Sequence, residues 1–205
     1  MAARTSRAGY RTGARLHSDI FLEESASIAK EINRDSIETM AQALSALRDR
    51  KGTLYLIGLG GSAANCSHAA ADFRKLCDIR SLAPTDNMAE FSARANDDGF
   101  SSVFSGWLTA AGAGEGDALM VFSVGGGTDS VSLAITRAIH YAQKHNMVIL
   151  GIVGPNGGAT AAHGDCVVKV SAKDKRITPH TEAFQAVIWH CLVSHPLLQA
   201  HPTKW

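Results

Sequence analysis

The sequence lacks any apolar stretch that approaches the roughly 20 residues needed to cross a membrane. No apolar segment typical of a signal peptide follows Met1. An excess of either charge is also missing, because the formal net charge is +1. We therefore expect no membrane and no nucleic acid among the partners of this protein.

Paired cysteines are absent as well. Cys66, Cys77, Cys166 and Cys191 are widely spaced and form no CxxC pair. This spacing excludes a zinc-finger framework and argues against a disulfide scaffold. We expect buried, reduced cysteines and a cytoplasmic protein.

Acidic residues are missing before Asp19, whereas arginine recurs at positions 4, 7, 11 and 15. This composition weakly resembles that of an organellar transit peptide, but it is more typical of a flexible extension or of a tail that docks on a neighbouring subunit. We predict a flexible basic tail over residues 1–16. Residues 17–205 then form a single domain, because no repeat or low-complexity linker divides them.

The hydrophobic pattern alternates between strands and helices, which predicts an α/β fold with a parallel sheet. Apolar runs typical of buried strands cover 53–57, 118–123, 147–153 and 166–170, and 81–83 is a shorter candidate. Helices are predicted at 17–30, 35–48, 62–76, 88–95, 101–111, 129–145 and 179–193. Asp35 and Glu38 are predicted to form a capping box at the start of the second helix.

Two predicted strands end in glycine-rich loops that carry hydroxyl groups. The first is Gly58-Leu59-Gly60-Gly61-Ser62 and the second is Ser123-Val124-Gly125-Gly126-Gly127-Thr128. Ligands of open α/β sheets bind outside the carboxyl ends of the strands, and helix N-termini favour anions. The two loops therefore predict a phosphate held by backbone N–H groups and hydroxyls, between helix starts at Ser62 and Thr128.

A dinucleotide site is the alternative interpretation of the first loop, because Gly58, Gly60 and Ala63 fit the Gly-x-Gly-x-x-Ala fingerprint. Asp78 lies twenty residues after Gly58, but it follows a predicted helix and precedes the next strand. A ribose-binding acid is expected at the end of that strand instead. The pattern therefore favours a phosphosugar over a dinucleotide.

The order of these motifs resembles the phosphoheptose isomerase branch of the SIS-domain family. The resemblance is carried by Gly60-Gly61-Ser62, by His68 and Asp72, by Asn96-Asp97-Asp98-Gly99-Phe100, by the second glycine loop, and by Glu182 and His190. It runs from about His17 to His195. It implies a doubly wound, five-stranded parallel sheet with N-terminal helices that build a homotetramer, and active sites at subunit interfaces.

The resemblance also assigns roles to individual residues. It implies phosphate or substrate binding by a set that comprises Gly60, Gly61, Ser62, Asn96, Asp97, Ser123 and Thr128. It implies acid–base catalysis by Asp72 and His190, and a divalent metal, with zinc as the expected ion, at His68, Asp72, Glu182 and His190. Spacing is compatible with this metal site, because each pair lies on one helix face and zinc accepts imidazole and carboxylate ligands.

Several positions depart from the family pattern. Leu59 stands where the family often has asparagine, Asp72 is one methylene shorter than the usual glutamate, and Glu182 replaces a neutral glutamine. The second loop also lacks most of the family's polar side chains. These departures bear on the exact substrate more than on the reaction class.

The resemblance implies an aldose–ketose isomerase that converts sedoheptulose 7-phosphate to a heptose 7-phosphate through an enediol. The alternative is a non-catalytic SIS protein that binds a phosphosugar or regulates a partner. The presence of His68, Asp72, Glu182 and His190 favours the enzyme, because a binding module has no need of paired acid–base groups.

Overall fold

The computed structural model describes residues 15–203, and the predicted tail over residues 1–16 lies almost entirely outside them. The helices are α1 (His17–Glu31), α2 (Arg34–Asp49), α3 (Gly61–Cys77), α4 (Met88–Asp97), α5 (Val103–Ala110), α6 (Leu133–Lys144), α7 (Gly158–His163) and α8 (Ile177–Val193). The strands are β1 (Leu54–Ile57), β2 (Ser81–Leu82), β3 (Ala118–Ser123), β4 (Val148–Val153) and β5 (Cys166–Lys169).

All strand pairs are parallel, and the sheet order is β2-β1-β3-β4-β5. The predicted doubly wound, five-stranded fold is therefore confirmed. After β1 the chain turns to one side to form β2, and it returns to the other side for β3. The topological switch point thus lies between β1 and β3, and both glycine-rich loops follow these two strands.

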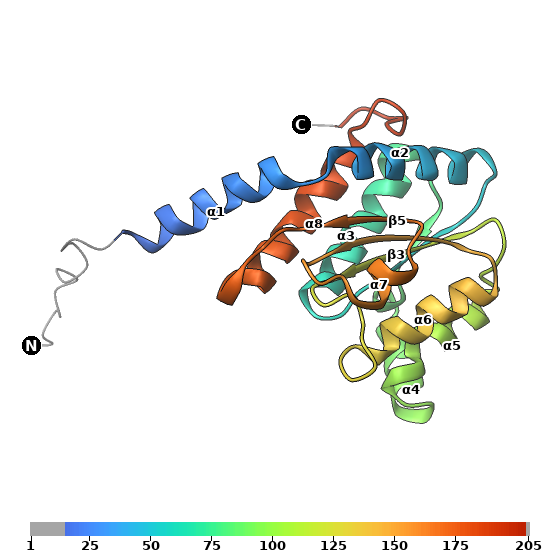
Figure 1. The fold of residues 1–205 in the computed structure, drawn as a ribbon. Coiled ribbons are helices and arrows are strands. Elements are labelled where there is room, and N and C mark those ends of the chain that lie inside the picture. The colour runs from blue at the N-terminus through green and yellow to red at the C-terminus, as the bar shows by residue number, and fades with distance from the viewer. Residues whose placement is uncertain (1–14, 204–205) are drawn as a thin grey trace, which may run out of the picture.

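Alternating side chains of the strands supply two hydrophobic cores, one on each face of the sheet. Leu54 and Leu56 of β1 belong to the core beneath α2, α3 and α8, whereas Tyr55 and Ile57 belong to the core beneath α5 and α6. Figure 1 shows these two layers of helices on opposite faces of the sheet. Burial of the strands on both faces explains their continuous apolar runs.

The N-terminal helices differ in how they are held. α2 packs on the core through Met40, Leu44 and Leu47, which are fully buried. α1 extends away from the sheet (Figure 1), and Ile28 is its one buried residue among those described. The predicted N-terminal helical extension is thus present, and its outer half has little packing within the chain.

Some predicted boundaries were wrong. α2 is capped by Asn33, whose Oδ1 accepts a hydrogen bond from the Ser36 N–H at 3.2 Å, and not by Asp35. α6 begins at Leu133 instead of 129, because Ser132 adopts a left-handed conformation with φ 60°. The short helix α7 was not predicted, since its small residues carry no apolar periodicity.

Within the described residues, no helix is both long enough and apolar enough to span a membrane.

Candidate active site

A polar cavity of about 290 Å³ opens at the switch point between β1 and β3. Its polar side chains come from both glycine-rich loops and from α8. The lining residues are Leu59, Ser62, Ser123, Val124, Gly125, Thr128, Val131, Ser132 and Glu182. The structure thus brings together Ser62, Ser123 and Thr128, the hydroxyl residues that the sequence placed at two strand ends.

Glycines let the first loop lie close to α8. Gly60 has φ 61°, a left-handed conformation that favours glycine. A Cβ on Gly61 would lie 2.6 Å from the Glu182 carboxylate, which is closer than real Cβ contacts allow. Gly61 therefore lets the Glu182 carboxylate lie directly over the first residue of α3.

Ser62 is buried and belongs to a hydrogen-bond chain between α3 and α8. Gln185 Nε2 donates to Ser62 Oγ at 3.1 Å, and Asn65 Nδ2 donates to Gln185 Oε1 at 2.8 Å. Because the Ser62 oxygen accepts from Gln185, its hydroxyl hydrogen is free to be donated to a ligand. Asn65 and Gln185 are not among the site residues expected from the sequence.

The second loop uses its hydroxyls partly for its own structure. Ser123 Oγ accepts the Gly126 N–H at 3.0 Å, and Thr128 Oγ1 accepts the Val131 N–H at 2.9 Å. Thr128 was predicted to begin a helix, but it lies in a turn that precedes α6. The prediction of two equivalent helix starts is therefore wrong for the second loop, although its hydroxyls still face the cavity.

A second group of side chains lies farther along α3 and α8. His68, Asp72 and His190 each offer a ligand atom, and these atoms lie within 4.8 Å of one another. Asp72 Oδ2 is 3.5 Å from His68 Nε2 and 3.6 Å from His190 Nε2. Two imidazoles and one carboxylate fit the donor preferences of zinc, so this group could hold a metal ion.

Two neighbouring contacts orient this group. His190 Nδ1 lies 2.8 Å from the Ala186 carbonyl oxygen, which can only accept, so Nδ1 carries a hydrogen and Nε2 is the ring nitrogen that faces Asp72. The buried Trp189 indole N–H donates to Asp72 Oδ2 at 3.2 Å. Contacts of this kind fix ligand orientation in metal sites. Trp189 is not among the site residues expected from the sequence.

Three of the predicted site residues lie elsewhere in the structure. Glu182 lines the polar cavity and is eight residues from His190 on α8, a separation of about 12 Å along a helix. Asn96 and Asp97 are exposed at the end of α4, and among the described residues neither lines this cavity or the histidine group. A single chain thus assembles three of the four predicted metal ligands.

The cavity and the histidine group share one pair of helices. α3 and α8 run in the same direction, because Ser62 at the start of α3 contacts Gln185 in the middle of α8, and Cys77 at the end of α3 contacts Val193 at the end of α8. Six residues separate Ser62 from His68, a rise of about 9 Å. The cavity and the histidine group are therefore two separate sites about 9 Å apart along the axis of α3, with no lining residue in common.

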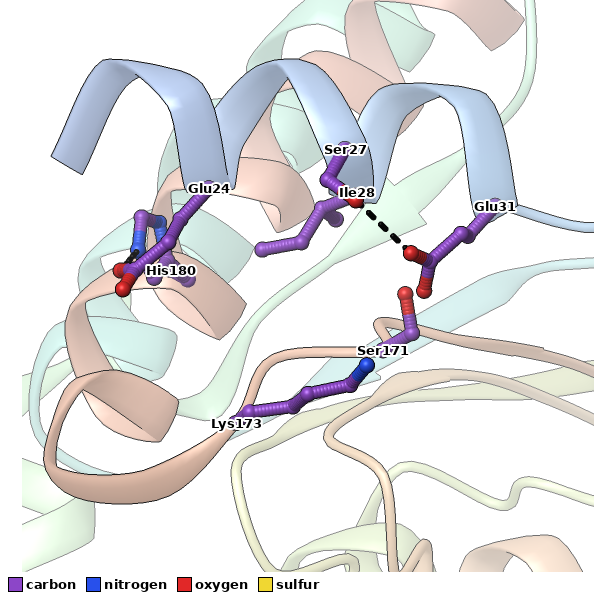
Figure 2. Close-up of a pocket in the computed structure, with 7 residues that line it drawn as sticks. All are labelled: Glu24, Ser27, Ile28, Glu31, Ser171, Lys173 and His180. Carbon is purple, nitrogen blue, oxygen red and sulfur yellow. Dashed lines mark hydrogen bonds and ion pairs between the residues drawn. The ribbon is translucent and has the colours of Figure 1, made fainter. Parts of the chain in front are cut away.

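Another cavity, of about 260 Å³, lies between α1 and the start of α8, as Figure 2 shows. Glu24 of α1 accepts from Arg176 Nε at 2.6 Å and lies 2.9 Å from His180 Nε2. Hydrogen bonds from Arg176 and then His180 lower the pKa of Glu24 to about 2. These contacts fasten the middle of α1 to the start of α8.

Comparisons with known proteins agree with this architecture. The phosphoheptose isomerase of Desulfovibrio desulfuricans is 34% identical over 194 residues, which cover 92% of this chain and 82% of that protein. The lincomycin biosynthesis protein LmbN of Streptomyces lincolnensis is 31% identical over 193 residues, or 88% of this chain and 66% of that protein. The structure of phosphoheptose isomerase GmhA from Neisseria gonorrhoeae superimposes with a TM-score of 0.76 at 24% identity, covering 86% of this chain and 95% of that one.

The family model described as "SIS domain" matches residues 20–154, which contain both glycine-rich loops and the His68–Asp72 pair. Together with the parallel sheet and its order, this match shows that the chain belongs to the SIS domain family.

Proposed function

We propose that this protein is an aldose–ketose isomerase of phosphorylated sugars, with sedoheptulose 7-phosphate as substrate and a heptose 7-phosphate as product. The observation that carries the proposal is the pairing of a hydroxyl-lined cavity with a His–Asp group along one pair of helices. The relatives named phosphoheptose isomerase support the choice of substrate.

The phosphoryl group of the substrate binds in the cavity at the switch point. Ser62 is a suitable donor, because its oxygen already accepts from Gln185 and its hydrogen remains free. Ser123 and Thr128 add hydroxyls from the second loop, and Gly60 and Gly61 allow close approach of the backbone. The carbonyl end of the sugar then lies toward the His–Asp group.

Asp72 is the residue that we assign to proton transfer. Its Oδ2 is held by the Trp189 N–H, which leaves Oδ1 to take a proton from the carbon beside the carbonyl and return it to the neighbouring carbon. The substrate passes through an enediol: the carbonyl oxygen gains a proton as the carbon loses one, and the neighbouring hydroxyl gives up a proton as its carbon becomes the new carbonyl, so the overall proton balance closes.

The donor set of His68, Asp72 and His190 fits a divalent metal, for which we propose zinc. When bound, it would supply Lewis-acid polarisation of the sugar carbonyl. Three protein ligands with an open position are typical of catalytic zinc sites. Glu182 is left out of this set because it lies about two helical turns away, in the cavity.

We further propose a homotetramer in the cytoplasm. Support for assembly comes from α1, which projects from the domain with Leu22 65% exposed, and from an apolar groove beside it that includes Ile37, Phe184 and Val187. Support for the compartment comes from the cysteines, which are all free thiols.

The test is incubation with a panel of sugar phosphates, with product identified by NMR, for the unmodified protein and for Asp72→Asn. We expect conversion of sedoheptulose 7-phosphate and its loss in Asp72→Asn, while circular dichroism shows the same fold. A parallel incubation after exhaustive chelation tests the metal. Conversion of no sugar phosphate by the unmodified, metal-supplemented protein contradicts the proposal and favours a binding protein.

A further inference from the structure

We infer that Glu182 is a specificity-determining residue that disfavours an anion entering the polar cavity alone and receives a hydrogen-bond donor of the sugar when a sugar phosphate binds. The inference rests on the proposed function, because it concerns how a sugar phosphate lies in the polar cavity. It goes beyond that function by stating which part of the substrate each side of the cavity accepts.

The first observation is the charge of the cavity. Among its described lining residues there is no lysine, arginine or histidine, and Glu182 is the one charged side chain. A phosphate in this cavity would therefore face a carboxylate and no fixed cation. Like charges in a partly enclosed site repel one another strongly, since little water is present to screen them.

The second observation is the position of the carboxylate. It lies over Gly61, the first residue of α3, so closely that a Cβ on Gly61 would be 2.6–2.8 Å from its atoms. The N–H groups at the start of a helix are where an anion is otherwise favoured. In this chain, the protein's own carboxylate already lies beside them.

The third observation is that the Glu182 carboxylate has no hydrogen-bond or ion-pair partner among the described residues. Throughout residues 15–203, no hydrogen bond or ion pair engages the Glu182 carboxylate, and only its backbone oxygen accepts from Asn65, at 2.9 Å. A half-buried carboxylate without a partner favours a ligand that donates hydrogen bonds, such as a sugar hydroxyl. The phosphoryl group then lies against the hydroxyl groups of the cavity, those of Ser62, Ser123 and Thr128.

Glu182 thus selects between ligands by repulsion as well as by attraction. Inorganic phosphate meets the unfavourable charge and carries no sugar hydroxyl that would offset it. A sugar phosphate offsets this charge with a hydroxyl that Glu182 accepts. The substrate class that follows is a polyhydroxylated sugar phosphate with a hydroxyl close to the phosphoryl group, and not a simple phosphate ester.

The experiment compares the binding of inorganic phosphate and of sedoheptulose 7-phosphate by calorimetry, in metal-free buffer, to the unmodified protein and to Glu182→Gln. Glutamine has the same shape without the charge. We expect Glu182→Gln to bind inorganic phosphate about tenfold more tightly or better, because the repulsion is removed. Its preference for the sugar phosphate over inorganic phosphate should fall by a similar factor. Glu115→Gln, at an exposed position outside the cavity, is the matched control and should change neither affinity.

Each other outcome has a distinct meaning. Equal affinity of both proteins for phosphate overturns the role of Glu182 and leaves the proposed cavity intact. No binding of either ligand to either protein, with circular dichroism showing that both are folded, overturns the phosphate cavity itself and this inference with it. An unchanged preference for the sugar phosphate in Glu182→Gln also contradicts the inference.

Discussion

At the scale of single residues, Trp189 supports the proposed metal site without being one of its ligands. Its indole N–H holds Asp72 Oδ2, and its ring stacks on Phe122 with centroids 6.0 Å apart. Trp189→Phe removes the donor and keeps an aromatic ring. We expect zinc affinity to fall by about 10–100-fold, as for other contacts that orient metal ligands.

Competition with a chromophoric chelator would measure this change. Trp107→Phe is the control, since Trp107 packs against Tyr55 in the other hydrophobic core. A zinc affinity in Trp189→Phe within twofold of the unmodified protein would show that Asp72 needs no such support.

The two hydroxyls predicted to bind phosphate should behave differently when removed. Ser62→Ala loses a free donor and should weaken sugar phosphate binding by about 1–3 kcal/mol. Thr128→Ala should act mainly through the loop, because its hydroxyl is bonded to Val131. We expect a smaller loss of affinity together with a lower melting temperature. Calorimetry and thermal unfolding of both variants separate the two effects, and a larger affinity loss in Thr128→Ala would reverse the assignment.

At this scale, the sequence predicts contacts between residues that are close along the chain better than contacts between residues that are far apart. His68 and Asp72 lie one helical turn apart, so their pairing is visible in the spacing. Their meeting with His190 depends on α3 packing beside α8, and only the family resemblance pointed to it. Trp189 and Gln185 were missed because a buried tryptophan or amide has no local pattern that separates packing from hydrogen bonding.

At the scale of elements, strand positions were predictable because strands buried on both faces leave unbroken apolar runs. Helix starts were less predictable. Asn33, rather than Asp35, caps α2, and both residues have side chains suited to capping. The late start of α6 depends on the left-handed Ser132, a conformation that residue type alone does not reveal.

The attachment of α1 to α8 should depend on pH through Glu24. Its pKa is lowered to about 2 by Arg176 and His180, so the ionised carboxylate is favoured in the folded state. The stabilisation is complete above the ordinary pKa of 4.5 and is lost as the pH falls through about 2. Glu24→Gln should loosen α1 already at pH 7.

Hydrogen exchange of the α1 amides, measured by mass spectrometry, would test this. We expect faster exchange in Glu24→Gln at pH 7, with α2 unchanged. Glu23→Gln is the matched control, because Glu23 also lies on α1 but pairs with Arg15, which precedes the helix. Identical exchange of α1 in Glu24→Gln and the unmodified protein would contradict an anchoring role.

At the scale of the whole molecule, the proposed tetramer is the simplest way to cover α1. Leu22 is 65% exposed on a helix with one buried residue, so an aspartate there should break the assembly. We expect light scattering to give four times the chain mass for the unmodified protein and a smaller mass for Leu22→Asp. Met88→Asp is the control, since Met88 is 62% exposed on α4. A monomeric mass at micromolar concentration would refute the tetramer.

Because α3 carries residues of both the cavity and the histidine group, the distance between these two sites along the helix is fixed. A helix cannot be stretched, so the rise of about 9 Å between the levels of Ser62 and His68 stays constant whatever is bound. Under the proposed assignment, a sugar phosphate reaches both ends only if its open carbon chain matches that interval. A triose phosphate would fill one end and leave the other empty. Inserting one residue into α3 between these positions would rotate His68 by about 100° away from α8. The number of residues between Ser62 and His68 is therefore a determinant of substrate size.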